Sequence, residues 1–384
     1  MGDITNLTMN WRSAMMLIVC LPVFIAAITL WRNKVERTPS RYLSAALVVT
    51  ILSVMPQIIG FAGFYNVWPG LTFFPFSNDL WLGPLLYLHA YSLMTGAKLG
   101  WRRYLLVPGI IQTTYYSACF LFLGDYQAKW AYNDALHYPY IYPVETTLSV
   151  VFLFASLVFI WKLYGSYLAF LNTTQSTLAD FDPVWIKRSV QISLLTALLF
   201  FLFEVLNATM GLSYVGGFPF LVAIMLCIAW LSIEAIWGLK ESYPKPSYSK
   251  PSRDNDALAE EPSKPSQPSS LNGELIKQQV KQNAWYLQAR FSLKDLSAKL
   301  GTNETYVSRA INQDLHKSFN DFINDLRVEH AQQLINQSLT QEVKLALYPL
   351  ALDSGFNSKA TFNRVFKQTT GITPSQYIKK SHIL

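Results

Sequence analysis

The chain is poor in the residue patterns that build catalytic or metal centres. Its 384 residues contain three cysteines, all inside apolar stretches, and their spacing matches no zinc site, redox motif or disulfide framework. We find no nucleophile–base pair, metal-ligand cluster or phosphate-binding loop in the sequence. We therefore predict no catalytic residue, no metal and no cofactor, and an enzyme is disfavoured. The cysteines are Cys20, Cys119 and Cys227.

Charged residues are scarce in residues 1–239, where they lie in short clusters between long apolar stretches. A membrane helix needs roughly 20 apolar residues to cross about 30 Å of hydrocarbon. Seven stretches qualify, so residues 1–239 are predicted to form a seven-span transmembrane domain. The expected spans are Ser13–Trp31, Arg41–Phe61, Leu80–Gly96, Tyr104–Leu123, Pro143–Tyr164, Ser189–Thr209 and Gly217–Gly238.

The loops between these spans alternate in charge. The loops after the first, third and fifth spans are rich in Lys and Arg, whereas the other three contain only Lys129. Because positive loops stay in the cytoplasm, the N-terminus is predicted outside and the C-terminus inside a bacterial inner membrane. The formal charge of +7 does not itself separate lipid from nucleic acid as a partner, since positive-inside membrane proteins are also basic. The outward loops are rich in aromatic residues, which favours an interfacial belt over a ligand-binding lid.

Ionisable side chains inside the spans are candidates for sensing. A charge at mid-membrane costs roughly 2.5–3.5 kcal/mol on insertion scales, and Glu204 interrupts the sixth span. Two interpretations of Glu204 stay open, ligand or proton sensing and a structural interhelical hydrogen bond. Glu145, His89 and Gln57 are further candidates, although a structural role is favoured for His89 and Gln57.

Residues 240–270 are rich in Pro and Ser, carry charges of both signs and contain almost no aliphatic residues. Such a segment buries too little apolar area to offset its chain entropy. We predict a disordered linker that gives a following domain reach.

Residues 271–384 form a helical, basic domain in this interpretation, with 14 Lys and Arg against 9 Asp and Glu. Apolar spacing predicts a helix from Ser292 that ends at Gly301, and a second helix over Asn303–Asn312 with an exposed polar face. This is the helix-turn-helix plan. The plan recurs around Gly355, where Ser358–Lys367 forms the second exposed helix, and a long helix from Phe319 to about Ser338 joins the two units.

This domain resembles the DNA-binding domain of the AraC/XylS family of bacterial transcription regulators. The resemblance rests on the string from Ala351 to Lys367, followed by Gly371-Ile372-Thr373-Pro374-Ser375-Gln376-Tyr377. It implies that the two exposed helices enter successive major grooves, about 34 Å apart. The sequence departs from the family at His316, where glycine is usual, and at Tyr348-Pro349. The soluble effector-binding domain common in the family is also replaced by the predicted membrane bundle.

Arg309 and Arg364 are the leading base-reading candidates, because a guanidinium can bond guanine through two donors. Further DNA-contact candidates lie on the same helices, where some could contact phosphate instead. They are Thr305, Ser308, Asn312, Lys359, Thr361, Asn363 and Lys367.

The sequence as a whole predicts an all-α, membrane-bound one-component transcription regulator that senses a membrane or external signal. Double-stranded DNA and the lipid bilayer are the expected partners, together with RNA polymerase, a second copy of the chain and an unidentified small molecule or membrane signal. The alternative is a transporter-like bundle with a fused regulatory DNA-binding domain, although no inverted repeat supports it.

Overall fold

The computed structural model describes residues 10–211, 215–239, 242–246, 272–341 and 346–381. These residues fall into two compact units. The first comprises residues 1–165 and 183–247, and the second comprises residues 166–182 and 248–384. Most of the predicted linker, residues 240–270, lies outside the described residues, so its disorder stays a prediction.

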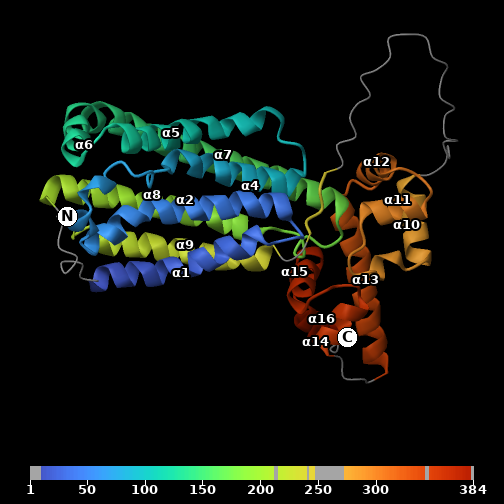
Figure 1. The fold of residues 1–384 in the computed structure, drawn as a ribbon. Helices are drawn as coiled ribbons and strands as arrows, with labels where there is room; N and C mark the ends of the chain where they lie inside the picture. Colours follow the sequence, from blue (N-terminus) through green and yellow to red (C-terminus); the bar gives the residue numbers. More distant parts are fainter. Residues whose placement is uncertain (1–9, 212–214, 240–241, 247–271, 342–345, 382–384) are drawn as a thin grey trace, which may run out of the picture. The chain divides into compact units, whose positions relative to one another are not determined.

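The described residues are helical, as the sequence predicted, and a single antiparallel bridge between Gln175 and Ser292 is their only extended pairing. The helices of the first unit run alongside one another (Figure 1). The long ones are α1 (Trp11–Trp31), α2 (Arg37–Phe61), α4 (Leu82–Thr95), α5 (Val107–Phe122), α7 (Tyr142–Thr174), α8 (Val184–Met210) and α9 (Phe218–Gly238). Residues 166–174 of α7 already belong to the second unit. Short helices α3 (Phe64–Val67) and α6 (Tyr126–Tyr132) lie between them, and a π-helical stretch, Asn133–Ile141, continues α6 into α7.

Six helical stretches among the described residues are long and apolar enough to cross a membrane. They correspond to α1, α2, α5 with the 3-10 turn before it, the run from α6 through α7, α8 and α9. The third predicted span is the exception. Its helix, α4, has 14 residues, which is about 21 Å of helix at 1.5 Å per residue and shorter than the hydrocarbon core. A count of seven spans therefore stays a prediction.

Large apolar side chains cover the outside of the first unit, while small and polar groups lie between its helices. Ile18 on α1 is 69% exposed and Phe122 on α5 is 83% exposed. Between the helices, the hydroxyl of Ser13 donates to the Ile58 carbonyl at 2.9 Å and that of Ser44 donates to the Ala27 carbonyl at 2.7 Å. Helices in lipid pack through such small residues and interhelical hydrogen bonds, so this distribution is the one expected in a bilayer.

The second unit holds α10 (Gly273–Gln282), α11 (Leu293–Lys299), α12 (Glu304–Asp314), α13 (Phe319–Thr340), α14 (Leu347–Asp353), α15 (Lys359–Thr370) and α16 (Pro374–Ser381). Helix α13 supplies residues to two hydrophobic clusters. Its first half, including Phe322 and Leu326, packs with α10, α11 and α12. Its second half, including Ala331 and Ile335, packs with α14, α15 and α16. One helix thus joins two small cores, each with three short helices of its own.

Local capping explains where these helices begin. Ser292 and Asp295 form a reciprocal capping box at α11, and the side chains of Asn303 and Ser358 accept from backbone N–H groups at α12 and α15. The predicted helix starts are therefore confirmed. Helix α14 follows Ala346 without a side-chain cap.

His316 occupies the left-handed region with φ of 52°, in the turn between α12 and α13. This conformation favours glycine, which is the residue usual there in the AraC/XylS family. The fold therefore keeps the turn despite the substitution.

Candidate nucleic-acid interface and polar sites of the bundle

The outer face of α12 is polar and accessible. Thr305, Arg309 and Asn312 are exposed, while Ser308 is half-buried and lies 3.4 Å from the Asn312 amide nitrogen. The opposite face buries Val307 and Ile311. The helix is thus fixed by its apolar side and presents the four predicted contact residues away from the core.

Helix α15 has the same division, with Phe362, Val365 and Phe366 buried. Lys359, Arg364 and Lys367 are exposed. Arg364 also borders a polar hollow of about 460 Å³ that is walled in part by Asp321 and Asp325 of α13. Arg364 and these two acidic residues therefore line the same depression.

Two other predicted contacts on α15 are less free. The Ser358 hydroxyl, which caps the helix, donates to the Thr361 hydroxyl at 3.0 Å. Asn363 is half-buried, and its side-chain oxygen has no hydrogen-bond partner among the described residues. Thr361 thus takes part in the hydrogen bonds that cap the start of α15. The side-chain oxygen of Asn363 can still accept a hydrogen bond from another molecule.

Arg327 of α13 is a polar centre that sequence reasoning missed. It is 0% exposed, and its guanidinium donates to the carbonyls of Tyr286 at 2.7 Å and Gln288 at 2.8 Å. Burial lowers the pKa of Arg327 to about 10, and the Asp180 carboxylate opposes that shift. Its sequence setting, in an amphipathic helix, gave no sign that it faces inward.

The segment between α7 and α8 belongs to this same unit and reaches Arg327. The guanidinium donates to the Ser176 hydroxyl at 3.2 Å and the Ser176 carbonyl at 3.3 Å. The Ser176 N–H donates to the Phe291 carbonyl at 3.1 Å, and the Thr177 hydroxyl donates to the Ala289 carbonyl at 3.0 Å. Asp180 pairs with Arg290 at 3.3 Å and accepts from the Asn357 amide. Residues 175–182 are therefore bonded to the helix-turn-helix part of the chain by both main-chain and side-chain contacts.

Glu145 is the centre of a polar cluster in the first unit. Its carboxylate accepts from the Gln112 amide and, at 3.1 Å, from the Tyr116 hydroxyl. His137 lies beside them, with its Nε2 3.4 Å from the Tyr116 hydroxyl and its Nδ1 3.0 Å from the Tyr115 hydroxyl. Gln112, Tyr116 and His137 were not among the predicted residues, because their proximity depends on how α5 and α7 face each other.

His89 lies elsewhere and does not meet Glu145. It is 4% exposed, its Nδ1 is 2.8 Å from the Pro39 carbonyl, and its ring is 5.3 Å from that of Trp185. The sensing candidates Glu145 and His89 therefore lie in two different places. Gln57 lies on α2, where its amide faces carbonyls of its own helix. Glu204 lies on α8, and its side chain is outside the described residues.

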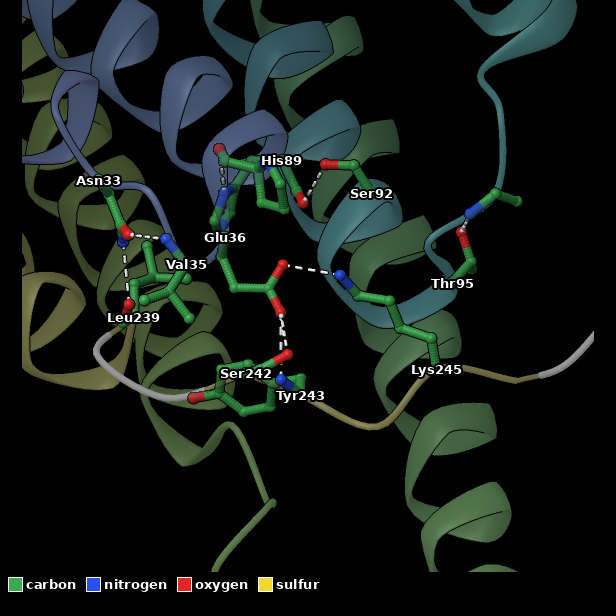
Figure 2. Close-up of polar contacts among 12 residues, drawn as sticks. Asn33, Val35, Glu36, His89, Ser92, Thr95, Leu239, Ser242, Tyr243 and Lys245 are labelled. Carbon is green, nitrogen blue, oxygen red and sulfur yellow. Dashed lines mark hydrogen bonds and ion pairs between the residues drawn. The ribbon is translucent and has the colours of Figure 1, made fainter. Parts of the chain in front are cut away.

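Glu36, just before α2, holds the residues that follow α9 (Figure 2). It is 2% exposed, and its carboxylate pairs with Lys245 at 2.7 Å and accepts from the Tyr243 N–H at 3.1 Å. The Ser242 hydroxyl lies 3.4 Å from the same carboxylate. We call this group the Glu36 cluster. Its ion pair joins the buried Glu36 to the partly exposed Lys245, 209 positions apart in the chain.

Residues 296–380 match the family model of a helix-turn-helix domain. This region includes both capped, polar-faced helices described above. The C-terminal part of the chain is therefore an AraC-type helix-turn-helix domain, as its motifs predicted. Such domains belong to the DNA-binding class of protein modules.

Two relatives share this part of the chain. An uncharacterized HTH-type transcriptional regulator of Staphylococcus aureus strain COL is 33% identical over 109 residues, which cover 28% of this chain and 14% of that protein. The HTH-type transcriptional activator RhaR of Escherichia coli O1:K1 / APEC is 26% identical over 110 residues, covering 29% of this chain and 37% of RhaR. The similarity thus spans a minor part of each protein. No solved structure matches the chain.

Proposed function

We propose that this chain is a membrane-bound one-component transcription regulator that binds double-stranded DNA through α12 and α15. The observation that carries the proposal is the matched helix-turn-helix domain, whose two capped helices present polar faces, joined in one chain to six helices long and apolar enough to span a bilayer. In this role α13 is the rigid connection that sets the spacing of the two recognition helices, because it contributes to both hydrophobic cores.

The location follows from the same features. The domain must lie on the cytoplasmic side to reach DNA, which agrees with the excess of Lys and Arg in the loops expected to face inward. A reporter fused after the last residue tests this placement. Activity of a reporter that works only in the cytoplasm supports the proposal, and activity of one that works only outside the membrane would refute it.

A route for the signal is proposed through residues 175–182. This segment joins α7 to α8, and it is hydrogen-bonded to Phe291, Ala289 and Arg327 of the helix-turn-helix unit. A movement of either helix would pull on these contacts directly. The domain therefore has a second connection to the preceding chain that does not depend on residues 247–271.

DNA recognition is tested with the full chain in lipid nanodiscs and fragments selected from genomic DNA by that chain. We expect Arg309→Ala and Arg364→Ala each to weaken binding of the selected fragment by about 1–3 kcal/mol, roughly 5- to 150-fold, and to relax its sequence preference. Lys277→Ala is the matched control, because it also removes one positive charge, on a side chain that is 41% exposed, but lies on α10.

Lys277→Ala is expected to change DNA affinity by less than about threefold. A single charge distant from the bases contributes only to the long-range electrostatic attraction between protein and DNA. Unchanged affinity and unchanged preference in both arginine variants would refute the assignment of α12 and α15 as the reading helices. If the arginine variants lose only as much DNA affinity as Lys277→Ala, and lose it equally on every DNA sequence, both arginines contribute sequence-independent attraction and do not read bases.

A further inference from the structure

A cavity of about 130 Å³ lies within the first unit, between α2, α4, α7, α8 and α9. Leu, Ile and Ala side chains make up most of its wall, and the few polar groups include His89, Ser193 and Thr196. For comparison, an engineered apolar cavity of about 150 Å³ takes up benzene. The space therefore fits a molecule with a single small ring.

His89, which lines this cavity, has one unsatisfied polar atom. Its Nδ1 lies 2.8 Å from the Pro39 carbonyl, and a carbonyl can only accept, so Nδ1 carries the proton of that bond. In the neutral ring Nε2 is then an acceptor. Nε2 is buried and has no hydrogen-bond partner among the described residues. A buried acceptor without a donor is costly, and a ligand that donates to it removes that cost.

From this geometry we propose that the cavity binds a small, membrane-soluble aromatic molecule that carries one O–H or N–H donor, as phenols and indoles do. The ring fills the apolar space and the donor bonds His89 Nε2. A hydrocarbon of equal size fits the space but leaves Nε2 unsatisfied, so the hydrogen bond supplies the selectivity. This inference names a ligand class for the sensing role proposed above.

The cavity wall is connected to the Glu36 cluster. Trp185 lines the cavity, and its indole N–H donates to the Tyr243 hydroxyl at 3.2 Å. That hydroxyl donates to the Gly238 carbonyl at 2.8 Å, and the Tyr243 N–H is held by Glu36. A ligand that moves Trp185 therefore acts on Tyr243, which lies five positions beyond the end of α9 at Gly238. Figure 2 shows Tyr243 at Glu36.

The test uses the full chain in nanodiscs with ¹⁵N-labelled histidine, and phenol and toluene as size-matched probes. We expect phenol to shift one imidazole Nε2 resonance saturably and to bind at least about fivefold more tightly than toluene, because one hydrogen bond separates them. Binding is measured without DNA, so its failure is distinguishable from failure of the regulator proposal.

Two variants separate the hydrogen bond from folding. His89→Asn keeps a nitrogen that can donate to Pro39 but has no acceptor at the Nε2 position, and it should abolish the preference for phenol. His89→Gln places an amide oxygen near the Nε2 position and should restore much of it. Equal binding of phenol and toluene to the wild type, or a preference retained in His89→Asn, would overturn the proposed site.

Hydrogen exchange at the Tyr243 amide tests the connection to the Glu36 cluster. Phenol is expected to change that exchange rate by at least about threefold in the wild type and not in His89→Asn. An unchanged rate with phenol bound would overturn the connection between the cavity and Tyr243.

Discussion

Arg327→Met tests the polar centre of the C-terminal unit. Methionine keeps most of the volume but removes every donor from a side chain that is 0% exposed. The carbonyls of Tyr286 and Gln288 then lose bonds of 2.7 and 2.8 Å. Each buried acceptor left unsatisfied costs about 1–3 kcal/mol, and breaking a buried charged group's contacts typically costs about 3–5 kcal/mol. We expect the unit to lose about 3–5 kcal/mol, a large share of the roughly 5–15 kcal/mol that stabilises a domain.

The measurement is hydrogen exchange of the buried amides of α13 in the full chain, carried out in nanodiscs. A loss of about 3–5 kcal/mol speeds exchange through global opening by roughly two to three and a half powers of ten. Arg290→Met is the control, because Arg290 is 54% exposed and its pair with Asp180 should contribute less than about 1 kcal/mol. Exchange within tenfold of the wild type in Arg327→Met would show that the guanidinium contacts do not support the fold.

Ser176→Ala measures how much the segment after α7 contributes to the same centre. It removes the hydroxyl that accepts from Arg327 at 3.2 Å and leaves the carbonyls of Tyr286 and Gln288 in place. We expect a loss of about 1 kcal/mol, the usual net contribution of one hydrogen bond. A loss as large as that of Arg327→Met would instead mean that the guanidinium is held mainly by the segment and not by its own domain.

Three further predictions concern packing, the Glu36 cluster and pH. Gly83→Ala should destabilise the first unit by about 1–3 kcal/mol, measured by unfolding in detergent, because the added Cβ would lie 2.6 Å from the Phe152 carbonyl oxygen. Gly165→Ala is the control and should not destabilise the unit, because no atom lies within 4 Å of its added Cβ. Glu36→Gln should speed exchange of the Tyr243 amide, because Lys245 loses its buried partner; unchanged exchange would contradict this. Burial lowers the pKa of His330, with Asp353 opposing, so the fold binds that proton more weakly than the unfolded chain does. The C-terminal unit should therefore lose stability as the pH falls through about 6.5, and His330→Gln should lose less over the same range in thermal unfolding.

The helix-turn-helix part was largely predictable because its signals are local. Ser292, Asn303 and Ser358 cap helices through bonds to residues three positions away. Gly301 and Gly355 stand at turns with φ of 64° and 83°, which glycine adopts readily. Apolar residues at helical spacing then decide which face of α12 and α15 is buried. Each of these features depends only on residues that lie within a few positions of one another in the sequence.

The polar sites of the bundle were not predictable in the same way. Its helices are apolar on nearly all sides, so no stripe in the sequence indicates which side faces a neighbour. The sequence named Glu145, Glu204 and His89 as candidates without predicting which residues lie near them, and the described partners of Glu145 are Gln112 and Tyr116, which lie on a different helix. Only the rotation of each helix about its axis, set by packing, decided those pairings.

By itself, the sequence determined the apolar lengths that suit a bilayer, the alternation of positive charge between successive loops and the two capped, polar-faced helices, since all three depend on composition and short-range spacing. Tertiary structure alone decided that Arg327 is buried, that Glu36 meets Lys245 across 209 positions, and that His89, which lines a cavity, has a buried nitrogen without a hydrogen-bond partner among the described residues. These contacts join residues far apart in the chain. The free energy of each contact depends on how deeply its polar groups are buried, which short-range sequence patterns do not predict.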